Sequence, residues 1–124
     1  MPQIFNAKNA PAAVGPYSQA VIHQGTIHLS GQLGLNPATG KLEEGVEAQA
    51  RQALANIKAV LEEAGTNMNN IIRCRVFLTD LNNFQIMNQM YIQAMGDHKP
   101  ARTTIQVAGL PMGGLVEIEA TAAI

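Results

Sequence analysis

The stretch Val46–Asp80, VEAQARQALANIKAVLEEAGTNMNNIIRCRVFLTD, contains a change of hydrophobic period that decides the fold class. In its first part, apolar residues recur every three or four positions, which predicts an amphipathic helix over residues 46–65. The apolar stripe consists of Val46, Ala50, Ala53, Leu54, Ile57, Val60, Leu61 and Ala64. Glutamates 43, 44 and 47 suit the positive N-terminal end of this helix, and Gly65 is a typical C-terminal stop.

From Asn70 to Asp80 the side chains alternate with a period of two, which predicts a β-strand. The two predicted faces carry Ile72, Cys74, Val76 and Leu78 on one side and Ile71, Arg73, Arg75 and Phe77 on the other. We expect the first face to pack against the helices, so that the two arginines lie on the opposite face.

The same two patterns extend in both directions along the chain. The further predicted elements are strands Gln19–His23 and Thr26–Ser30 around a turn at Gln24-Gly25, a helix over residues 82–96 with the stripe Phe84, Met87, Tyr91, Ala94 and Met95, and strands Ala101–Val107 and Leu115–Ala123. An additional short strand at QIFN, before Lys8, fits the pattern. Two helices can cover only one face of a sheet of about six strands, which predicts a single α+β domain, residues 1–124, built as a two-layer sandwich.

Composition and charge narrow the class of protein. The chain has a net charge of −1 and no run of Lys or Arg, which argues against nucleic-acid binding. Only 14% of its residues are charged, against a typical value of about 25%, which favours a surface hidden by self-association. No apolar run is long enough to span a bilayer, and the N-terminal residues lack the features of a signal peptide. With one cysteine, Cys74, the chain suits a reducing compartment, and we expect a cytoplasmic protein without membrane partners.

The last two predicted strands carry charges that call for an explanation. Alternation places Arg102 and Thr104 together on one face, and Glu117 and Glu119 together on one face. We expect all four on the face opposite the helices, with the two strands as antiparallel neighbours. The residues alone leave two interpretations open. One is a cross-strand Arg–Glu pair contributing about 0–1 kcal/mol. The other is a small anion site, in which the arginine fork binds a carboxylate and a glutamate holds a water.

Other candidate sites are weaker. Cys74 is expected to be an inert core thiol, since it faces the helices with Val76 and Leu78. The three histidines lack the spacing of metal ligands, which argues against a metal site. No helix follows the glycines of SGQLGLNPATG to receive a phosphate, and no Ser-His-Asp or Cys-His arrangement is indicated.

The segment PARTTIQVAGLPMGGLVEI, Pro100–Ile118, resembles the C-terminal signature of the Rid (YjgF) family. Segments along nearly the whole chain look like their counterparts in the RidA-type subgroup: NAPAAVGPYSQA, SGQLGLNPATG, QARQALANIKAVLEEAG, VFLTDLNNF and NQMYIQAMGDHKPAR. The resemblance implies a chorismate-mutase-like fold and a homotrimer with clefts between subunits. It also implies cofactor-independent hydrolysis of enamines and imines, such as 2-aminoacrylate and 2-iminobutanoate, to 2-oxo acids and ammonia.

The resemblance also implies site residues. Arg102 of the P-A-R motif would clamp the substrate carboxylate, and Glu117 of V-E-I would position or activate water. The implied substrate-binding set is completed by Tyr17, Ser30, Gly31, Asn88 and Thr104. This chain departs from the family pattern at Thr104, where many members have cysteine, at Gly109, where a basic residue is common, and in a shorter loop before Lys99. A non-catalytic regulator that binds small carboxylates in the same cleft is the alternative, and a ribonuclease-type activity ranks third because basic surface and stacking aromatics are few.

Overall fold

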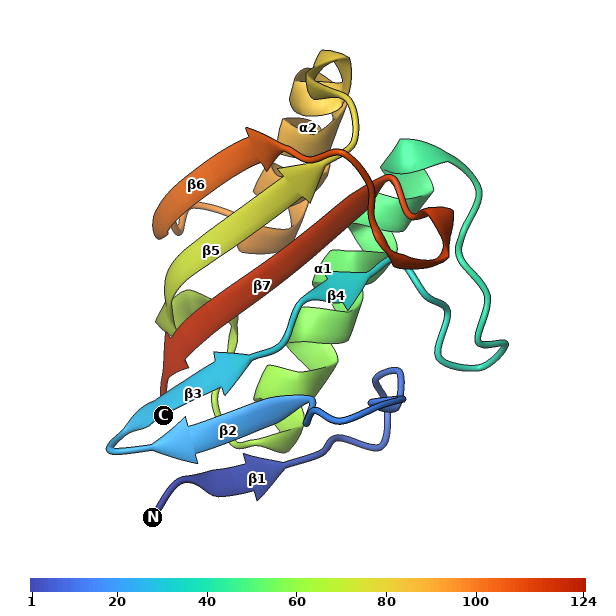
Figure 1. The fold of residues 1–124 in the computed structure, drawn as a ribbon. Coiled ribbons are helices and arrows are strands. Elements are labelled where there is room, and N and C mark those ends of the chain that lie inside the picture. Colours follow the sequence, from blue (N-terminus) through green and yellow to red (C-terminus); the bar gives the residue numbers. More distant parts are fainter.

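The computed structural model describes all residues, 1–124, and folds them into a mixed sheet with two α-helices on one face (Figure 1). The strands are β1 (Gln3–Phe5), β2 (Ala20–His23), β3 (Thr26–Leu29), β4 (Gln32–Leu33), β5 (Ile71–Leu78), β6 (Ala101–Gln106) and β7 (Val116–Ala123), and the helices are α1 (Gly45–Glu63) and α2 (Phe84–Met95). Three single turns of 3₁₀ helix lie at Met68–Asn70, Leu81–Asn83 and Pro111–Gly113. The predicted α+β two-layer architecture is confirmed. No helix combines the length and apolar character needed to cross a membrane.

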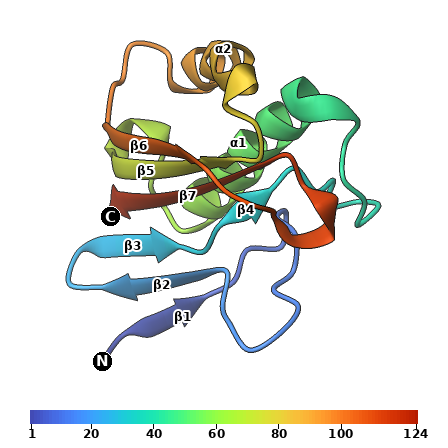
Figure 2. The same ribbon diagram turned by 45° about the horizontal axis from the view of Figure 1, so that its top comes forward.

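The central strand of the sheet is β7. The strand order is β1-β2-β3-β7-β5-β6, and the short β4 pairs with β7 beyond the end of β3. All pairs are antiparallel except β5 with β6, which are parallel and joined by α2 as a crossover. The prediction that the last two strands are neighbours is wrong, because β5 lies between them. The link from β6 to β7 is much longer than a tight hairpin turn, so the chain can pass over β5 before it returns (Figure 2).

The core lies between the sheet and the helices. On α1 the predicted stripe is confirmed at its buried members, Ala50, Ala53, Leu54, Ile57, Val60 and Leu61. On β7, Val116, Ile118, Ala120 and Ala122 are buried, whereas Glu117, Glu119 and Thr121 are half-buried on the face that no helix covers. Complete burial of a side chain such as Ile57 or Leu61 stabilises the fold by about 1.5–3 kcal/mol. The strict alternation along β7 therefore aims both of its glutamates away from the helices.

Two predicted face assignments are wrong, and the first lies at the start of β5. Ile71 is 2% exposed, whereas Ile72 is 51% exposed. The register shifts here: Ile71 pairs with Ala122 and Arg73 with Thr121, which leaves Ile72 as the extra residue of a β-bulge. A bulge interrupts the alternation, so the assignment that holds from Cys74 to Leu78 fails before Arg73.

The second wrong assignment concerns β6, whose side chains lie on the reverse faces from those predicted. Arg102 pairs in register with Cys74, which is fully buried under the helices, so Arg102 and Thr104 lie on the helix side. On the other face, Thr103 accepts a hydrogen bond from Arg73 (2.9 Å), and Ile105 is 44% exposed. Since β6 is an edge strand that the helices cover only in part, its hydrophobic pattern does not mark the core face.

Candidate active site

All of the predicted site residues except Thr104 line one of two separate clefts. Tyr17, Ser30, Gly31 and Glu117 line a cleft of about 680 Å³ beside β4, which we call the glutamate cleft. Asn88 and Arg102 line a second cleft of about 530 Å³ between α2 and the start of β6, together with Tyr91; we call this the arginine cleft. The two clefts lie on opposite faces of the sheet, so one chain does not bring Arg102 and Glu117 together.

In the glutamate cleft the side chain of Glu117 lies against the backbone of Gly31. A Cβ atom on Gly31 would lie 2.0 Å from Oε1 of Glu117, so the carboxylate occupies the space that a side chain would take. Partial burial raises the pKa of Glu117, and the nearby charge of Glu119 raises it further. Glu119 forms an ion pair with Arg75, whereas Glu117 has no ion-pair partner. Glu117 is therefore a carboxylate that can accept a proton in the cleft.

The loop that carries Tyr17 is held by hydrogen bonds from the start of β2 and the end of β3. The side chain of Gln19 accepts from the backbone N–H of Ala7 and donates to the carbonyl of Pro11. The Ser30 hydroxyl donates to the carbonyl of Ser18 at 2.6 Å, and its backbone N–H donates to the carbonyl of Gln19. Ser30 thus fixes the loop, while Tyr17, 55% exposed, presents its side chain at the rim of the cleft.

In the arginine cleft the guanidinium of Arg102 lies over two aromatic rings of α2. Its Cζ atom is 4.8 Å from the ring centroid of Tyr91 and 5.6 Å from that of Phe84. Residues Gly96–Pro100, in the loop between α2 and β6, border the same cleft. Phe84 and Tyr91 were predicted as members of the core stripe; Tyr91 is buried, but both rings also face Arg102. Sequence reasoning missed this role, although the spacing Asn88-x-x-Tyr91 places those two residues one helical turn apart on the same face.

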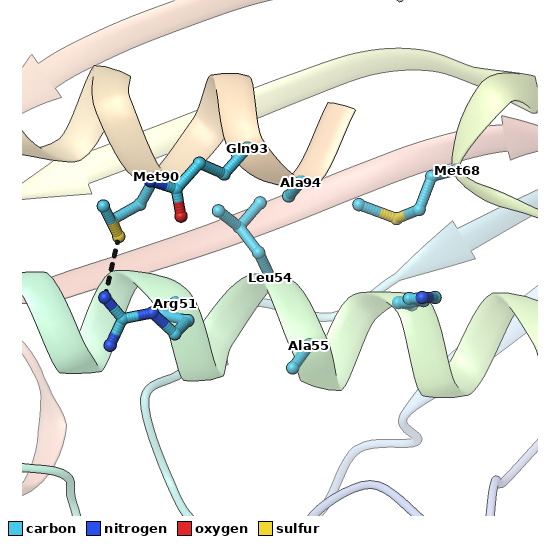
Figure 3. A pocket seen from close by; sticks show the side chains of 8 residues that line it. Arg51, Leu54, Ala55, Met68, Met90, Gln93 and Ala94 are labelled. Carbon is cyan, nitrogen blue, oxygen red and sulfur yellow. Dashed lines mark hydrogen bonds between the residues drawn. The ribbon is translucent and has the colours of Figure 1, made fainter. Parts of the chain in front are cut away.

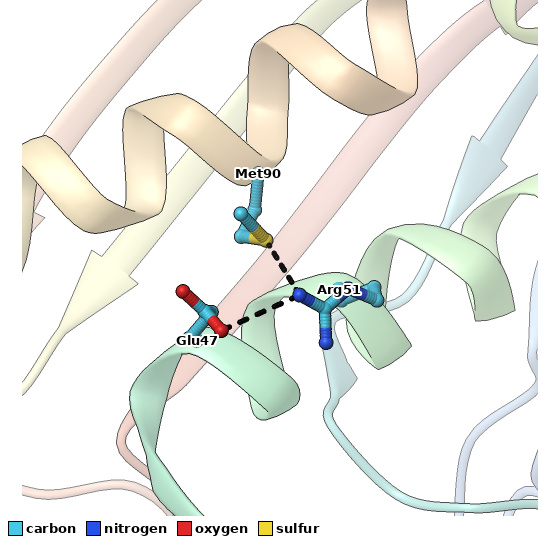
Figure 4. A network of polar contacts seen from close by, with 3 residues as sticks. All are labelled: Glu47, Arg51 and Met90. Atoms are coloured by element: carbon cyan, nitrogen blue, oxygen red, sulfur yellow. Dashed lines mark hydrogen bonds and ion pairs between the residues drawn. The ribbon is translucent and has the colours of Figure 1, made fainter.

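Among the four arginines of the chain, only Arg102 has no hydrogen-bond or ion-pair partner in the protein. Arg51 contacts Glu47 and the sulfur of Met90 (Figure 4), Arg73 donates to Thr103, and Arg75 pairs with Glu119. The cross-strand Arg–Glu pair of the first interpretation exists, but its arginine is Arg75. The guanidinium of Arg102 therefore keeps its N–H donors free for an anion.

Three polar atoms close to this arginine are buried without a nitrogen or oxygen hydrogen-bond partner: Oδ1 of Asn88, the hydroxyl of Tyr91 and Oγ1 of Thr104. Buried polar atoms without partners are uncommon in folded proteins, because each one costs the free energy of its lost hydration. Asn88 and Tyr91 line the same cleft as Arg102, and Thr104 lies two residues further along the same face of β6. Of these atoms, Oδ1 of Asn88 can accept a hydrogen bond from a ligand and the Thr104 hydroxyl can donate one.

Two other features contribute little to the site. Cys74 is fully buried, and burial raises the pKa of its thiol, in keeping with the predicted inert core residue. A groove of about 290 Å³ between α1 and α2, lined by Leu54, Met68 and Met90, holds none of the predicted site residues (Figure 3). Nowhere do three His, Cys, Asp or Glu side chains gather in a group that could hold a metal ion.

Comparison with known proteins gives consistent matches along the chain. The model of the Endoribonuclease L-PSP family matches residues 7–124. A 2-iminobutanoate/2-iminopropanoate deaminase of Bos taurus is 49% identical over 121 residues, which make up 97% of this chain and 88% of that protein.

Solved structures agree with this match. RidA from the Antarctic bacterium Psychrobacter sp. PAMC 21119 superposes with a TM-score of 0.95 at 47% identity, covering 98% of this chain and 99% of that one. The structure of Escherichia coli TdcF with bound serine has a TM-score of 0.94 at 40% identity, covering 98% of both chains. In each case the likeness extends over essentially the whole molecule.

Proposed function

The chain belongs to the Rid (YjgF) family, and from this premise we propose that it is a hydrolytic deaminase of 2-imino acids and their enamine tautomers. Its substrates are small reactive species such as 2-aminoacrylate and 2-iminobutanoate, and its products are 2-oxo acids and ammonia. The observation that carries the proposal is the guanidinium of Arg102, which has no hydrogen-bond or ion-pair partner in the protein and lines a cleft together with the unpartnered Oδ1 of Asn88. The name of the Bos taurus relative and the serine bound to TdcF support a small-carboxylate substrate.

We propose that the working site forms between subunits of a homotrimer, where the arginine cleft of one chain meets the glutamate cleft of the next. Each cleft alone holds half of the chemistry, since Arg102 and Glu117 lie on opposite faces of the sheet. The uncovered sheet face carries half-buried charges and the exposed Ile105, which suits a surface that packs against another copy. We also place the protein in the cytoplasm, as its single buried cysteine suits a reducing compartment.

The chemistry follows from these groups. Arg102 binds the substrate carboxylate with two parallel N–H donors, while Asn88 and Thr104 offer further polar contacts. A protonated imine conjugated to a carboxylate is already electrophilic at C2, so the main requirement is to orient it and a water molecule. Glu117 accepts a proton as the water oxygen bonds to C2. The proton on Glu117 then passes to the amino group of the resulting carbinolamine. The C–N bond breaks as the C=O bond forms, and ammonia leaves with the hydroxyl proton as ammonium, which returns Glu117 to its ionised form.

The second candidate is a non-catalytic regulator that binds small carboxylates. It needs Arg102 but not Glu117, so the presence of a carboxylate without an ion-pair partner in the glutamate cleft favours the enzyme. A ribonuclease activity, as the family description would suggest, is less well supported. The net charge of the chain is −1, and three of its four arginines are engaged within the protein.

The test generates 2-iminobutanoate in situ from threonine with a threonine dehydratase and measures the release of 2-oxobutanoate. We expect the protein to accelerate this release, and we expect Arg51→Ala, which alters an exposed arginine on the helix surface, to do so equally. Oligomeric state is measured in the same samples by light scattering. A trimer that leaves the rate unchanged would favour the regulator, and a catalytically active monomer would refute the inter-subunit site.

A further inference from the structure

We propose that Tyr91, assisted by Phe84, is the positioning residue of Arg102, and that the aromatic faces hold this guanidinium without using its hydrogen-bond donors. This inference rests on the proposed function, because it assumes that Arg102 binds the carboxylate of the ligand. The sequence pattern assigns Tyr91 only to the apolar stripe of its helix.

The geometry is that of a cation held against aromatic rings on one helix. Tyr91 lies two turns after Phe84 on α2, and the guanidinium carbon of Arg102 is within 6 Å of both ring centroids. Tyr91 is 8% exposed and Phe84 is 37% exposed. The ring of Tyr91 is therefore a fixed surface inside the fold, whereas the ring of Phe84 is partly exposed to solvent.

The way in which the guanidinium of Arg102 is held affects how it can bind a carboxylate ligand. Where a carboxylate fixes an arginine, as Glu119 fixes Arg75, the carboxylate occupies N–H donors of the guanidinium. A ring face attracts the cation through its quadrupole and leaves the donors in the guanidinium plane free. A carboxylate ligand can then take both donors of one edge without displacing an internal partner. Fixing the side chain in advance also lowers the entropy lost when the ligand binds.

We assign this role to the ring of Tyr91 rather than to its hydroxyl. The hydroxyl is buried on the side of the core, where the thiol of Cys74 is its one, weak hydrogen-bond partner. Burial is the main reason why the pKa of Tyr91 is raised, so the phenol stays neutral. Phenylalanine at this position would keep the face under Arg102 and remove only the hydroxyl.

The experiment compares Tyr91→Phe with Tyr91→Leu, using Met87→Ala as a control for lost packing. Met87 is a fully buried residue of α2 that does not line the arginine cleft. Binding of 2-oxobutanoate is measured by calorimetry. The values of kcat and KM are measured by steady-state kinetics with 2-iminobutanoate as substrate. Tyr91→Leu is expected to raise Kd and KM roughly tenfold and to lower kcat less than threefold. Tyr91→Phe and Met87→Ala are expected to bind within about twofold of the unaltered protein.

Two outcomes would overturn the inference: unchanged binding by Tyr91→Leu, or an equal loss in Tyr91→Phe, which would assign the role to the hydroxyl. If Tyr91→Leu does not fold, Phe84→Leu replaces it, because Phe84 is partly exposed. Its expected loss of binding is about threefold, and unchanged binding would overturn the positioning role of the two rings. Failure of the proposed function has a different signature. In that case Arg102→Ala would still bind 2-oxobutanoate, or the unaltered protein would bind it without deaminating 2-iminobutanoate.

Discussion

In the arginine cleft a cation lies against two aromatic rings, and in the glutamate cleft a carboxylate lies against bare backbone. Neither charge has an ion-pair partner inside its own chain, although Arg75 and Glu119 on the same sheet pair with each other. Among the arginines and glutamates of the strands, Arg75 thus pairs with Glu119 and Arg73 donates to Thr103, whereas Arg102 and Glu117 have no such partner. On these strands, the two charges that the family resemblance implies as site residues are the two that lack a partner within the chain.

The largest effect is expected from removing the cation of the arginine cleft. Arg102→Ala should lower kcat/KM about 10²–10⁴-fold, because two charge-assisted hydrogen bonds to the substrate are lost. The fold should persist, since Arg102 makes no hydrogen bond within the protein. Steady-state kinetics and circular dichroism check the two parts, and Arg51→Ala is the matched control. Full activity in Arg102→Ala would contradict the site assignment.

The carboxylate of the glutamate cleft comes next. Glu117→Gln should lower kcat about 10²–10⁴-fold and leave the Kd for 2-oxobutanoate nearly unchanged, because a base acts in the chemical step rather than in binding. Equal losses in rate and binding would instead indicate a structural role.

The pH dependence sharpens the assignment of Glu117. Since the base must be ionised and its pKa is raised, activity should fall on acidification at a pH above the usual titration range of glutamate. When the pKa of a carboxyl group is higher in the folded than in the unfolded state, the folded protein loses stability as the pH rises through the folded-state pKa. Glu117→Gln should therefore raise the melting temperature at neutral pH, measured by calorimetry, and a lowered melting temperature would contradict the raised pKa.

A smaller effect is expected from filling the space beneath the carboxylate. In Gly31→Ala the new methyl group would meet Oε1 of Glu117, the movable end of a side chain, so the carboxylate should shift while the fold remains. We expect kcat to fall roughly 10²-fold, because a catalytic group displaced by about 1 Å typically costs that much. The melting temperature should change little. Gly34→Ala is the matched control: its Cβ would lie 2.4 Å from the backbone of Gln49, so it should lose stability instead. The prediction fails if both variants lose stability alike.

The smallest effect concerns Thr104, the residue that replaces the cysteine found in many family members. Its Oγ1 atom is buried without a partner on the same face as Arg102. Thr104→Val keeps the shape of the side chain and removes its hydroxyl. It should raise KM by about threefold to tenfold, which corresponds to the loss of one neutral hydrogen bond to the ligand. Thr104→Ser, which keeps the hydroxyl, should bind close to the unaltered protein. A valine variant with unchanged KM would exclude the hydroxyl from ligand binding.

The sequence predicts the fold best in the elements that have one side packed between the sheet and the helices. The stripe of α1 and the alternation of β7 are strong because one side of each element is wholly buried, so every apolar position has the same environment. Those two patterns sufficed to predict the layers and to aim Glu117 away from the helices. Family resemblance, rather than periodicity, then singled out Arg102 and Glu117 as the working residues.

Other features were decided only by the tertiary structure. The bulge at Ile72 shifts the register without any sequence mark, and β6 lies at an edge where both faces are partly exposed, so alternation could not tell which face held Arg102. The order of the strands placed β5 between β6 and β7 and so separated Arg102 from Glu117. Which arginine is paired depends on neighbours brought together from distant parts of the chain. The sequence therefore determined the elements and the identity of the charges, whereas tertiary packing decided which charges remain free, because long-range pairing, not local period, supplies or withholds their partners.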